Sequence, residues 1–182
     1  MKDYLETLRY YGPELLKSLG DSGVMLGYSM LAAVFLGLPL GTILYLVSQR
    51  PQRGFKIAAL FLNRSIDVVR SFPFLLLVIS LIPVTRTLLG TAFGTTAAAF
   101  PLGIVATALA ARLFEQVLLE VPREVLELGR VLGASQRQLV LDFLYVEARS
   151  GLVLSLTSVM VSMLSYSTVM GVVGGGGIGD FA

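Results

Sequence analysis

The stretch SGLVLSLTSVMVSMLSYSTVMGVVGGGGIG, residues 150–179, contains no charged side chain. A helix of roughly 20 apolar residues is long enough to cross the hydrocarbon core of a bilayer. Two further uncharged runs cover residues 24–47 and 87–111. All three runs are continuously apolar rather than alternating, which favours spanning helices over the strands of a β-barrel. We therefore predict an all-α, polytopic helical membrane protein.

The composition of the whole chain agrees with this prediction. Of its 182 residues, 55% are hydrophobic and only 14% are charged, whereas soluble domains carry about 25% charged residues. The sequence has no cysteine and no histidine, so it can form neither a disulfide nor a metal site built on those ligands. It also lacks the phosphate loop G-x-x-x-x-G-K-[ST]. We expect no metal and no cofactor in this chain, and any ATP would be bound by a partner.

The apolar runs predict four spans, at residues 24–47, 60–82, 96–111 and 150–173. The second span is predicted as one long helix from about residue 55 to residue 82, with a kink at Pro73 and an end at Pro83. Pro39 is expected to kink the first span for the same reason, since a proline ring removes a helical hydrogen bond.

The basic residues set the expected orientation, because cytoplasmic loops hold the excess of lysine and arginine. Residues 48–71 and 112–149 contain five basic residues each, whereas residues 1–21 contain three and the connection around Arg86 contains one. We therefore place both basic loops in the cytoplasm and the N-terminus outside. Residues 1–21 are expected to form an amphipathic segment at the outer face, and residues 22–182 a single transmembrane domain.

Residues 119–152 carry signals for two short amphipathic helices joined by a sharp turn. Pro122 suits the first turn of a helix, and Gly133 can supply a left-handed cap at its C-terminus. Ser135 is followed three residues later by Gln138, the spacing of a capping box that starts a second helix. An exposed apolar side on the first helix favours docking to a soluble partner, and its expected members are Val125, Leu128 and Leu132.

The same segment resembles the cytoplasmic E-A-A loop of the permease subunits of type I ABC importers. Glu127-Leu128-Gly129 stands where that family has E-A-A, and Gly133-Ala134 follows at the family's distance. Tyr145-Val146 replaces a later L-P of the family pattern. Four stretches resemble the methionine-importer branch in particular: RSFPF at residues 70–74, IPVTRTLLGTAFG at 82–94, LLEVP at 118–122 and GGGGIG at 174–179.

The resemblance implies the ABC type I permease fold and the permease subunit of an ATP-driven amino-acid importer, with methionine as the expected substrate. Transport would proceed by alternating access, and the chain itself would not be an enzyme. The implied partners are a second copy of the chain, cytoplasmic ABC ATPases, an extracytoplasmic substrate-binding protein and the bacterial inner membrane, but no nucleic acid. Members of this branch have a fifth span after the glycine segment, so the chain is expected to be truncated. The residues expected to dock the ATPase are Arg123, Glu124, Glu127, Leu128, Gly129, Gly133, Ala134 and Ser135.

Serines recur along the fourth predicted span at helical spacing. Ser155, Ser158, Ser162 and Ser165 follow one another at i, i+3, i+7 and i+10 and form a polar stripe on an otherwise apolar helix. Small hydroxyl residues commonly serve helix packing in membranes. Alternatively, the stripe lines a substrate path together with Met163 and Tyr166.

Two other functions fit parts of the sequence. Gly177-Ile178-Gly179-Asp180 matches G-x-G-D, the signature of intramembrane aspartyl proteases, but that chemistry needs a second aspartate within the bilayer. The remaining aspartates, at positions 3, 21, 67 and 142, fall outside the predicted spans or at their edges. A small structural or channel-forming membrane protein is the other alternative.

Overall fold

The computed structural model describes residues 2–49 and 53–181, and within these residues every regular element is helical. Arg50, one of the basic residues of the predicted loop 48–71, lies outside the described residues. Three helical stretches are long and apolar enough to cross a membrane, or up to four if a bent pair of helices counts as one span. This agrees with the expected all-α, polytopic architecture.

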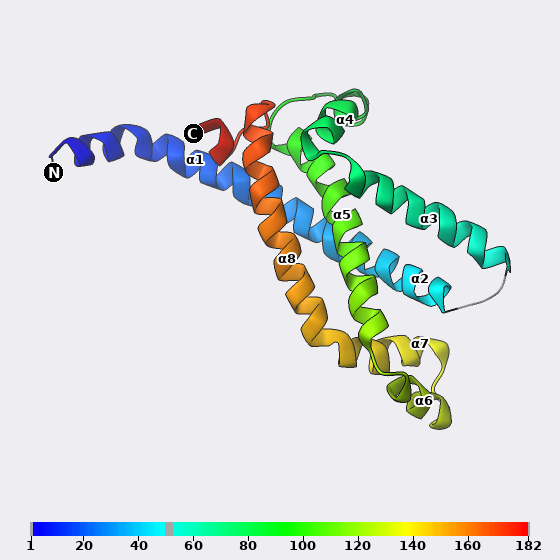
Figure 1. The fold of residues 1–182 in the computed structure, drawn as a ribbon. Helices are drawn as coiled ribbons and strands as arrows, with labels where there is room; N and C mark the ends of the chain where they lie inside the picture. Colours follow the sequence, from blue (N-terminus) through cyan, green and yellow to red (C-terminus); the bar gives the residue numbers. More distant parts are fainter. Residues whose placement is uncertain (1, 50–52, 182) are drawn as a thin grey trace.

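A single long helical stretch forms the first part of the chain (Figure 1). α1 (Lys2–Ala32) continues through a π-helical turn, η1 (Ala33–Gly37), into α2 (Leu38–Ser48). The π turn ends two residues before Pro39, whose ring removes a helical hydrogen bond. Such π turns are a recognised cause of irregularity in a helix. The boundary expected at residue 21 does not coincide with a helix end. The placement of residues 1–21 at the outer face stays a prediction.

The second predicted span is not one helix. α3 (Arg53–Ser71) and α4 (Phe74–Leu89) are bent by 112° at the break between them. The break is sharper than the predicted kink because Pro73 lacks an N–H and disfavours helical geometry at Phe72, and Pro73 itself is extended, with φ −55° and ψ 128°. Pro83 does not end α4 as expected, since it lies inside that helix. The end is at Gly90, which has φ +75°.

α5 (Thr95–Glu120) is the central helix and packs against α1, α2, α3, α4 and α8. Its buried positions are mostly small, which lets its neighbours approach closely. A Cβ placed on Gly41 of α2 would lie 2.6 Å from the carbonyl oxygen of Ala111. α5 continues for more than two turns beyond residue 111, where the third span is predicted to end. The charged residues there, Arg112 and Glu115, are paired with each other and do not interrupt the helix.

The last long stretch joins three elements without interruption: α7 (Gln136–Gln138), η2 (Leu139–Leu144), which is π-helical, and α8 (Tyr145–Val172). The prediction of two short helices in residues 119–152 is therefore only half correct. α6 (Arg123–Val131) is short, but the second helix continues into the fourth span. A four-residue helix, α9 (Ile178–Phe181), follows four consecutive glycines at residues 174–177, which we call the glycine run.

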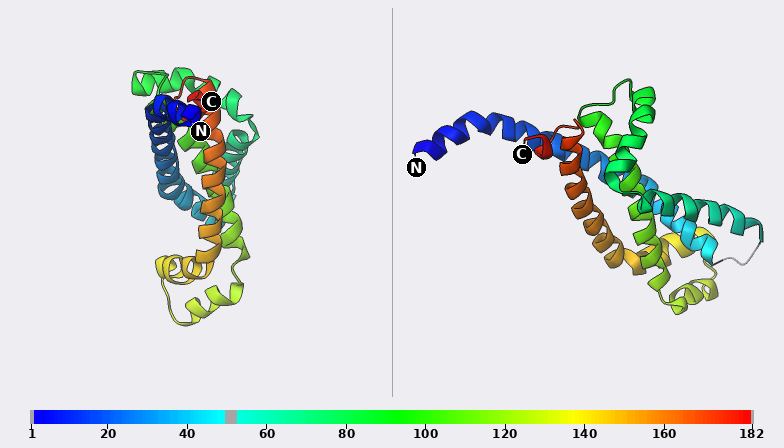
Figure 2. Two further views of the ribbon diagram at one scale, coloured as in Figure 1. Left: turned by 90° about the vertical axis from the view of Figure 1, so that its left-hand side faces the viewer. Right: turned by 45° about the horizontal axis from the view of Figure 1, so that its top comes forward.

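The helices α6 and α7 lie together at one end of α5 and α8, and the α4–α5 connection and the glycine run lie at the other end (Figure 1; Figure 2). The predicted docking loop and the glycine run thus lie at opposite ends of the spanning helices.

Candidate functional site

The turn after α6 is closed by backbone hydrogen bonds. The N–H of Gly133 donates to the carbonyl of Arg130, and the N–H of Ala134 donates to the carbonyl of Gly129, each at 3.0 Å. These two bonds form a Schellman motif, which needs a left-handed residue at the position of Gly133. Gly133 has φ +78°. The predicted left-handed cap is confirmed.

The predicted capping box is also present at the start of α7. The hydroxyl of Ser135 accepts a hydrogen bond from the backbone N–H of Gln138 at 3.3 Å, and the backbone N–H of Ser135 donates to Gln138 Oε1 at 2.9 Å. The cap fixes the start of the helix that becomes α8. Consequently α6 is held in a sharp turn at the end of a long, continuous helix.

Gly129 lies where α6 approaches η2. It is buried, and a Cβ placed on it would come within 2.6 Å of Leu139 Cδ2 and 3.2 Å of the Phe143 ring. A glycine therefore permits α6 to pack closely against η2, which gives a local reason for the departure from E-A-A at this position.

The outward side of α6 and its turn carries exposed apolar side chains. The exposed fractions are 57% for Leu128, 84% for Val131 and 69% for Leu132. These three residues form what we call the outer patch. Val125, expected in the apolar stripe, is half-buried, and Val131 was not predicted although it follows Leu128 by three residues. An exposed cluster of this kind marks an interaction site.

The predicted docking residues are thus brought together on one helix and its turn, but they face different ways. Glu124 and Leu128 are exposed, Gly129 is buried against η2, and Arg123 and Glu127 line a cavity between α6 and the ends of α2 and α5. Gly133, Ala134 and Ser135 form the turn.

An ion cluster that was not predicted from the sequence connects α3 with α5. Arg112 donates to Asp67 at 2.6 Å, to Glu115 at 2.7 Å and to Asn63 Oδ1 at 3.0 Å. Glu115 is buried, and Asp67 is half-exposed. Asp67 is the single acidic residue of the basic segment 48–71. Charged groups at the depth of a spanning helix are costly unless paired.

The serine stripe divides between two environments on α8. Ser155 is buried, as are the neighbouring Met163 and the unpredicted Ser167, while Ser158 and Ser165 are exposed. The hydroxyls of Ser158, Ser162 and Ser165 donate to backbone carbonyls of the preceding turn at 3.1, 2.9 and 3.2 Å. The ring of Tyr166 stacks on Phe74 at 4.4 Å. The six predicted path residues are thus divided between buried, half-buried and exposed positions of α8.

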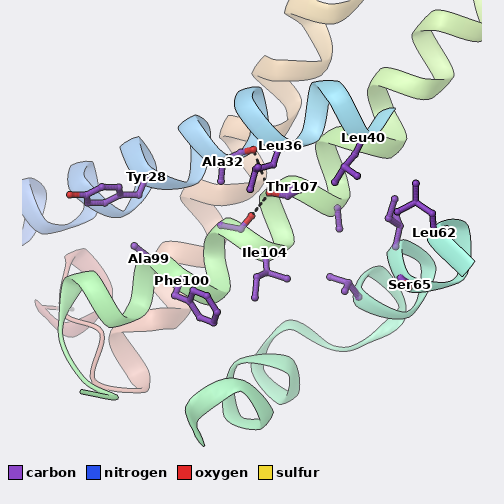
Figure 3. A pocket seen from close by; sticks show the side chains of 14 residues that line it. Tyr28, Ala32, Leu36, Leu40, Leu62, Ser65, Ala99, Phe100, Ile104 and Thr107 are labelled. Atoms are coloured by element: carbon purple, nitrogen blue, oxygen red, sulfur yellow. Dashed lines mark hydrogen bonds between the residues drawn. The ribbon is translucent and has the colours of Figure 1, made fainter. Parts of the chain in front are cut away.

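A different hollow lies among α1, α2, α3 and α5. It has a volume of about 470 Å³, and its side chains point into a common space from all four helices (Figure 3). Its lining is nearly all apolar, and Thr107 directs its hydroxyl to the carbonyl of Gly103 at 2.7 Å rather than into the hollow. None of the predicted site residues belongs to its lining.

The glycine run is tightly turned. Gly174, Gly176 and Gly177 have φ between +75° and +84°, a region that glycine enters without penalty. The carbonyl of Gly174 accepts from the N–H of Gly94 at 3.0 Å, and the N–H of Ile178 donates to the hydroxyl of Ser22 at 2.9 Å. The run thus ties the end of α8 to α1 and to the start of α5.

Comparison with known proteins gives concordant results. The family model described as "Binding-protein-dependent transport system inner membrane component" matches residues 37–182. The probable D-methionine transport system permease protein MetI of Vibrio cholerae is 42% identical over 151 residues, which cover 81% of this chain and 65% of that protein. The corresponding protein of Haemophilus influenzae is 38% identical, with 85% and 72% covered.

Solved structures show the same fold. A chain of the MetNI methionine ABC transporter, in an inward-facing conformation, superposes with a TM-score of 0.84 at 33% identity, over 91% of this chain and 77% of that chain. An amino-acid ABC transporter crystallised with histidines superposes with a TM-score of 0.68 at 21% identity and is similar in fold. The family model covers more than half of the chain. The chain therefore belongs to the family of inner-membrane components of binding-protein-dependent transport systems.

Proposed function

We propose that the chain is the permease subunit of an ATP-driven methionine importer. The observation that carries the proposal is the outer patch on α6, held by the Schellman motif and the capping box at one end of the spanning helices. A helix with exposed apolar residues is suited to receive motion from a partner when its C-terminal end is fixed by hydrogen bonds to the following turn, as the end of α6 is. The similarity to methionine-transport permeases supports methionine as the substrate.

The proposed partner at the outer patch is a cytoplasmic ABC ATPase, which binds the ATP. A substrate-binding protein would deliver methionine to the opposite end, where the glycine run lies. Both basic loops would then face the cytoplasm of a bacterial cell and the N-terminus would be outside. This topology is supported by the distribution of basic residues and by the separation of α6 from the glycine run (Figure 1).

A homodimer is proposed for the transport-competent permease. The exposed face of α8 with Ser158 and Ser165 would meet the same face of a second copy and form a path with polar walls. The chain would then work by alternating access and perform no covalent chemistry. In such a dimer the serine stripe would be functional at its exposed members, while Ser155 and Met163 would serve packing within each protomer.

The outer patch gives the decisive test. Co-expression with the ATPase of a methionine importer, followed by purification through a tag on this chain, is expected to recover the ATPase. The variant Leu128→Asp/Val131→Asp is expected to lose it, since two charges would enter an apolar contact. Phe93→Asp is a matched control, because Phe93 is 68% exposed but lies at the opposite end of the spans.

Equal recovery of the ATPase with the patch variant and the wild-type chain would refute the proposed docking site. The substrate is tested with the same complex in liposomes. Labelled methionine is expected to accumulate only with ATP and binding protein, and excess unlabelled methionine is expected to compete. Uptake that methionine does not inhibit would refute methionine as the substrate and leave the docking site intact.

A further inference from the structure

A cavity separates the inner side of α6 from the ends of two spanning helices. It has a volume of about 580 Å³ and lies among the end of α2, the end of α5, α6 and η2. Its polar lining residues are Tyr45, Gln49, Arg123, Glu127, Arg130 and Gln136. The outer patch has no residue in this lining, whereas two of the predicted docking residues, Arg123 and Glu127, belong to it.

The charged residues of the cavity leave one net positive charge. Arg123, Glu127 and Arg130 share one side of α6, at i, i+4 and i+7. Among the described residues, the ion pairs within 4.0 Å are those of Arg112 alone. Both cavity arginines therefore have no carboxylate at contact distance in this part of the chain and keep their guanidinium groups available as donors.

Tyr45 contributes a hydroxyl donor to the cavity. The residue is only 5% exposed and lies in the core formed with Leu118 and Leu144. Its hydroxyl makes no hydrogen bond within the described part of the chain, in contrast to that of Tyr145, which lies 2.6 Å from Thr42 Oγ1. No completely buried side-chain polar atom of the described residues lacks a partner, so the Tyr45 hydroxyl opens into the cavity that the residue lines. A buried phenol normally has a hydrogen-bond partner.

This donor set fits an anion with several oxygens. Two guanidinium groups and a phenol can each donate to phosphate oxygens, and guanidinium binds phosphate through two parallel hydrogen bonds. The rest of the lining is apolar, with Leu46, Leu119, Val121, Leu126, Leu139, Val140 and Leu144. The cavity also lies at the ends of two candidate spans, the level at which lipid headgroups reside. Basic pockets between helices at this level bind lipid headgroups.

We propose that this cavity binds the phosphate group of an anionic phospholipid, with its apolar part against the leucine and valine side chains. A soluble phosphate ester has the same charged group and is the other possible source. The assignment of the site to the cytoplasmic leaflet rests on the proposed function, but the binding itself does not. A lipid held here would contact both α2 and α6 and would link the position of α6 to the spanning helices.

Binding to the purified full-length chain in neutral detergent tests the proposal without any ATPase. The probes are dihexanoyl-phosphatidylglycerol, dihexanoyl-phosphatidylcholine and inorganic phosphate, and the readout is stoichiometry and Kd by equilibrium dialysis. Phosphatidylglycerol is expected to bind one per chain, and phosphatidylcholine about tenfold more weakly. We expect about tenfold weaker phosphatidylglycerol binding for Arg130→Gln and about threefold weaker binding for Tyr45→Phe.

Arg137→Gln is the matched control, because Arg137 is exposed on the neighbouring helix and does not line the cavity. Its binding is expected to equal that of the wild-type chain. Arg130→Lys keeps the charge and is expected to bind more tightly than Arg130→Gln, which separates loss of a ligand contact from loss of folding. Displacement of the lipid by inorganic phosphate would assign the site to soluble phosphate compounds, and failure to displace it would assign the site to lipid.

The proposal is overturned if neither phosphatidylglycerol nor phosphate binds saturably. It is equally overturned if Arg130→Gln and Arg137→Gln bind alike while their helical circular-dichroism spectra match the wild type. Loss of ATPase recovery in the docking experiment would leave these binding constants unchanged, so a failure of the proposed function is distinguishable from a failure of this inference.

Discussion

At the residue scale, Arg112 determines how α3 meets α5. Its guanidinium satisfies Asp67 and Glu115 together, and Glu115 is nearly fully buried. Arg112 and Asp67 are 45 residues apart in sequence, so the spacing of residues within α3 does not reveal this contact. Isolated carboxylates at this depth would be expensive, which is why one arginine with two acidic partners is retained on an otherwise apolar helix.

Removal of this arginine is expected to destabilise the chain. Arg112→Ala leaves two carboxylates without a cation, and we expect a loss of about 2 kcal/mol, reduced from the value for a fully buried pair because Asp67 is half-exposed. The measurement is the thermal midpoint of the detergent-solubilised chain. Adding Glu115→Gln to Arg112→Ala should recover part of the loss, whereas no recovery would show that the cluster is not electrostatic. Arg137→Ala, without an ion pair in the described part of the chain, is the control.

At the element scale, the glycines of the first helical stretch have different roles. A Cβ on Gly41 would meet the Ala111 carbonyl at 2.6 Å, whereas one on Gly27 would meet nothing within 4 Å. Both glycines belong to G-x-x-x-G pairs in the sequence, Gly37 with Gly41 and Gly23 with Gly27. The spacing permits close helix contact, but only the packing of α5 decides which pair makes one.

The two glycines make a matched pair of variants. Gly41→Ala is expected to cost about 1–3 kcal/mol, because backbone atoms of α5 would have to move. Gly27→Ala is expected to be neutral or to stabilise by roughly 0.5–1 kcal/mol, since alanine favours a helix. Thermal midpoints of the two purified variants provide the comparison. A loss with Gly27→Ala as large as with Gly41→Ala would contradict the described packing of α2 against α5.

At the scale of the whole molecule, the described arrangement places α6 and the glycine run at opposite ends of the spans (Figure 2). In the proposed topology, which follows the distribution of positive charges, these two ends lie on opposite sides of the membrane. A second copy of the chain would cover the exposed face of α8, which includes Ser158 and Ser165. The topology and the dimer contact each relate distant parts of the molecule, which no local sequence pattern can place relative to each other.

The absence of cysteine from the sequence allows the proposed topology and the proposed dimer contact to be tested with single-cysteine variants. Thr91→Cys is expected to react with a membrane-impermeant maleimide in intact cells, and Arg137→Cys only after permeabilisation. Ser162→Cys is expected to form a disulfide between two copies, which requires Cα atoms within about 7 Å, while the buried Ser155→Cys is not. Labelling of Arg137→Cys in intact cells would reverse the topology, and a monomeric Ser162→Cys under oxidation would refute the proposed interface.

The sequence by itself determined the elements with strong local signals. Long uncharged runs predicted the spans, Gly133 predicted the left-handed turn, and Ser135 with Gln138 predicted the cap, because each depends on a few consecutive residues. The resemblance to a permease family came from the same consecutive residues and agrees with the family match.

Only the tertiary structure decided which groups meet. It gave Asp67 its partner on α5, divided the serine stripe between a buried and an exposed face, and formed the cavity in which Tyr45 lies beside Arg123 and Arg130. It also decided the 112° bend at Pro73, where a sequence pattern permits either a kinked helix or a break. The physical reason is that these outcomes depend on packing between helices distant in sequence, whereas helix signals depend on the backbone of near neighbours.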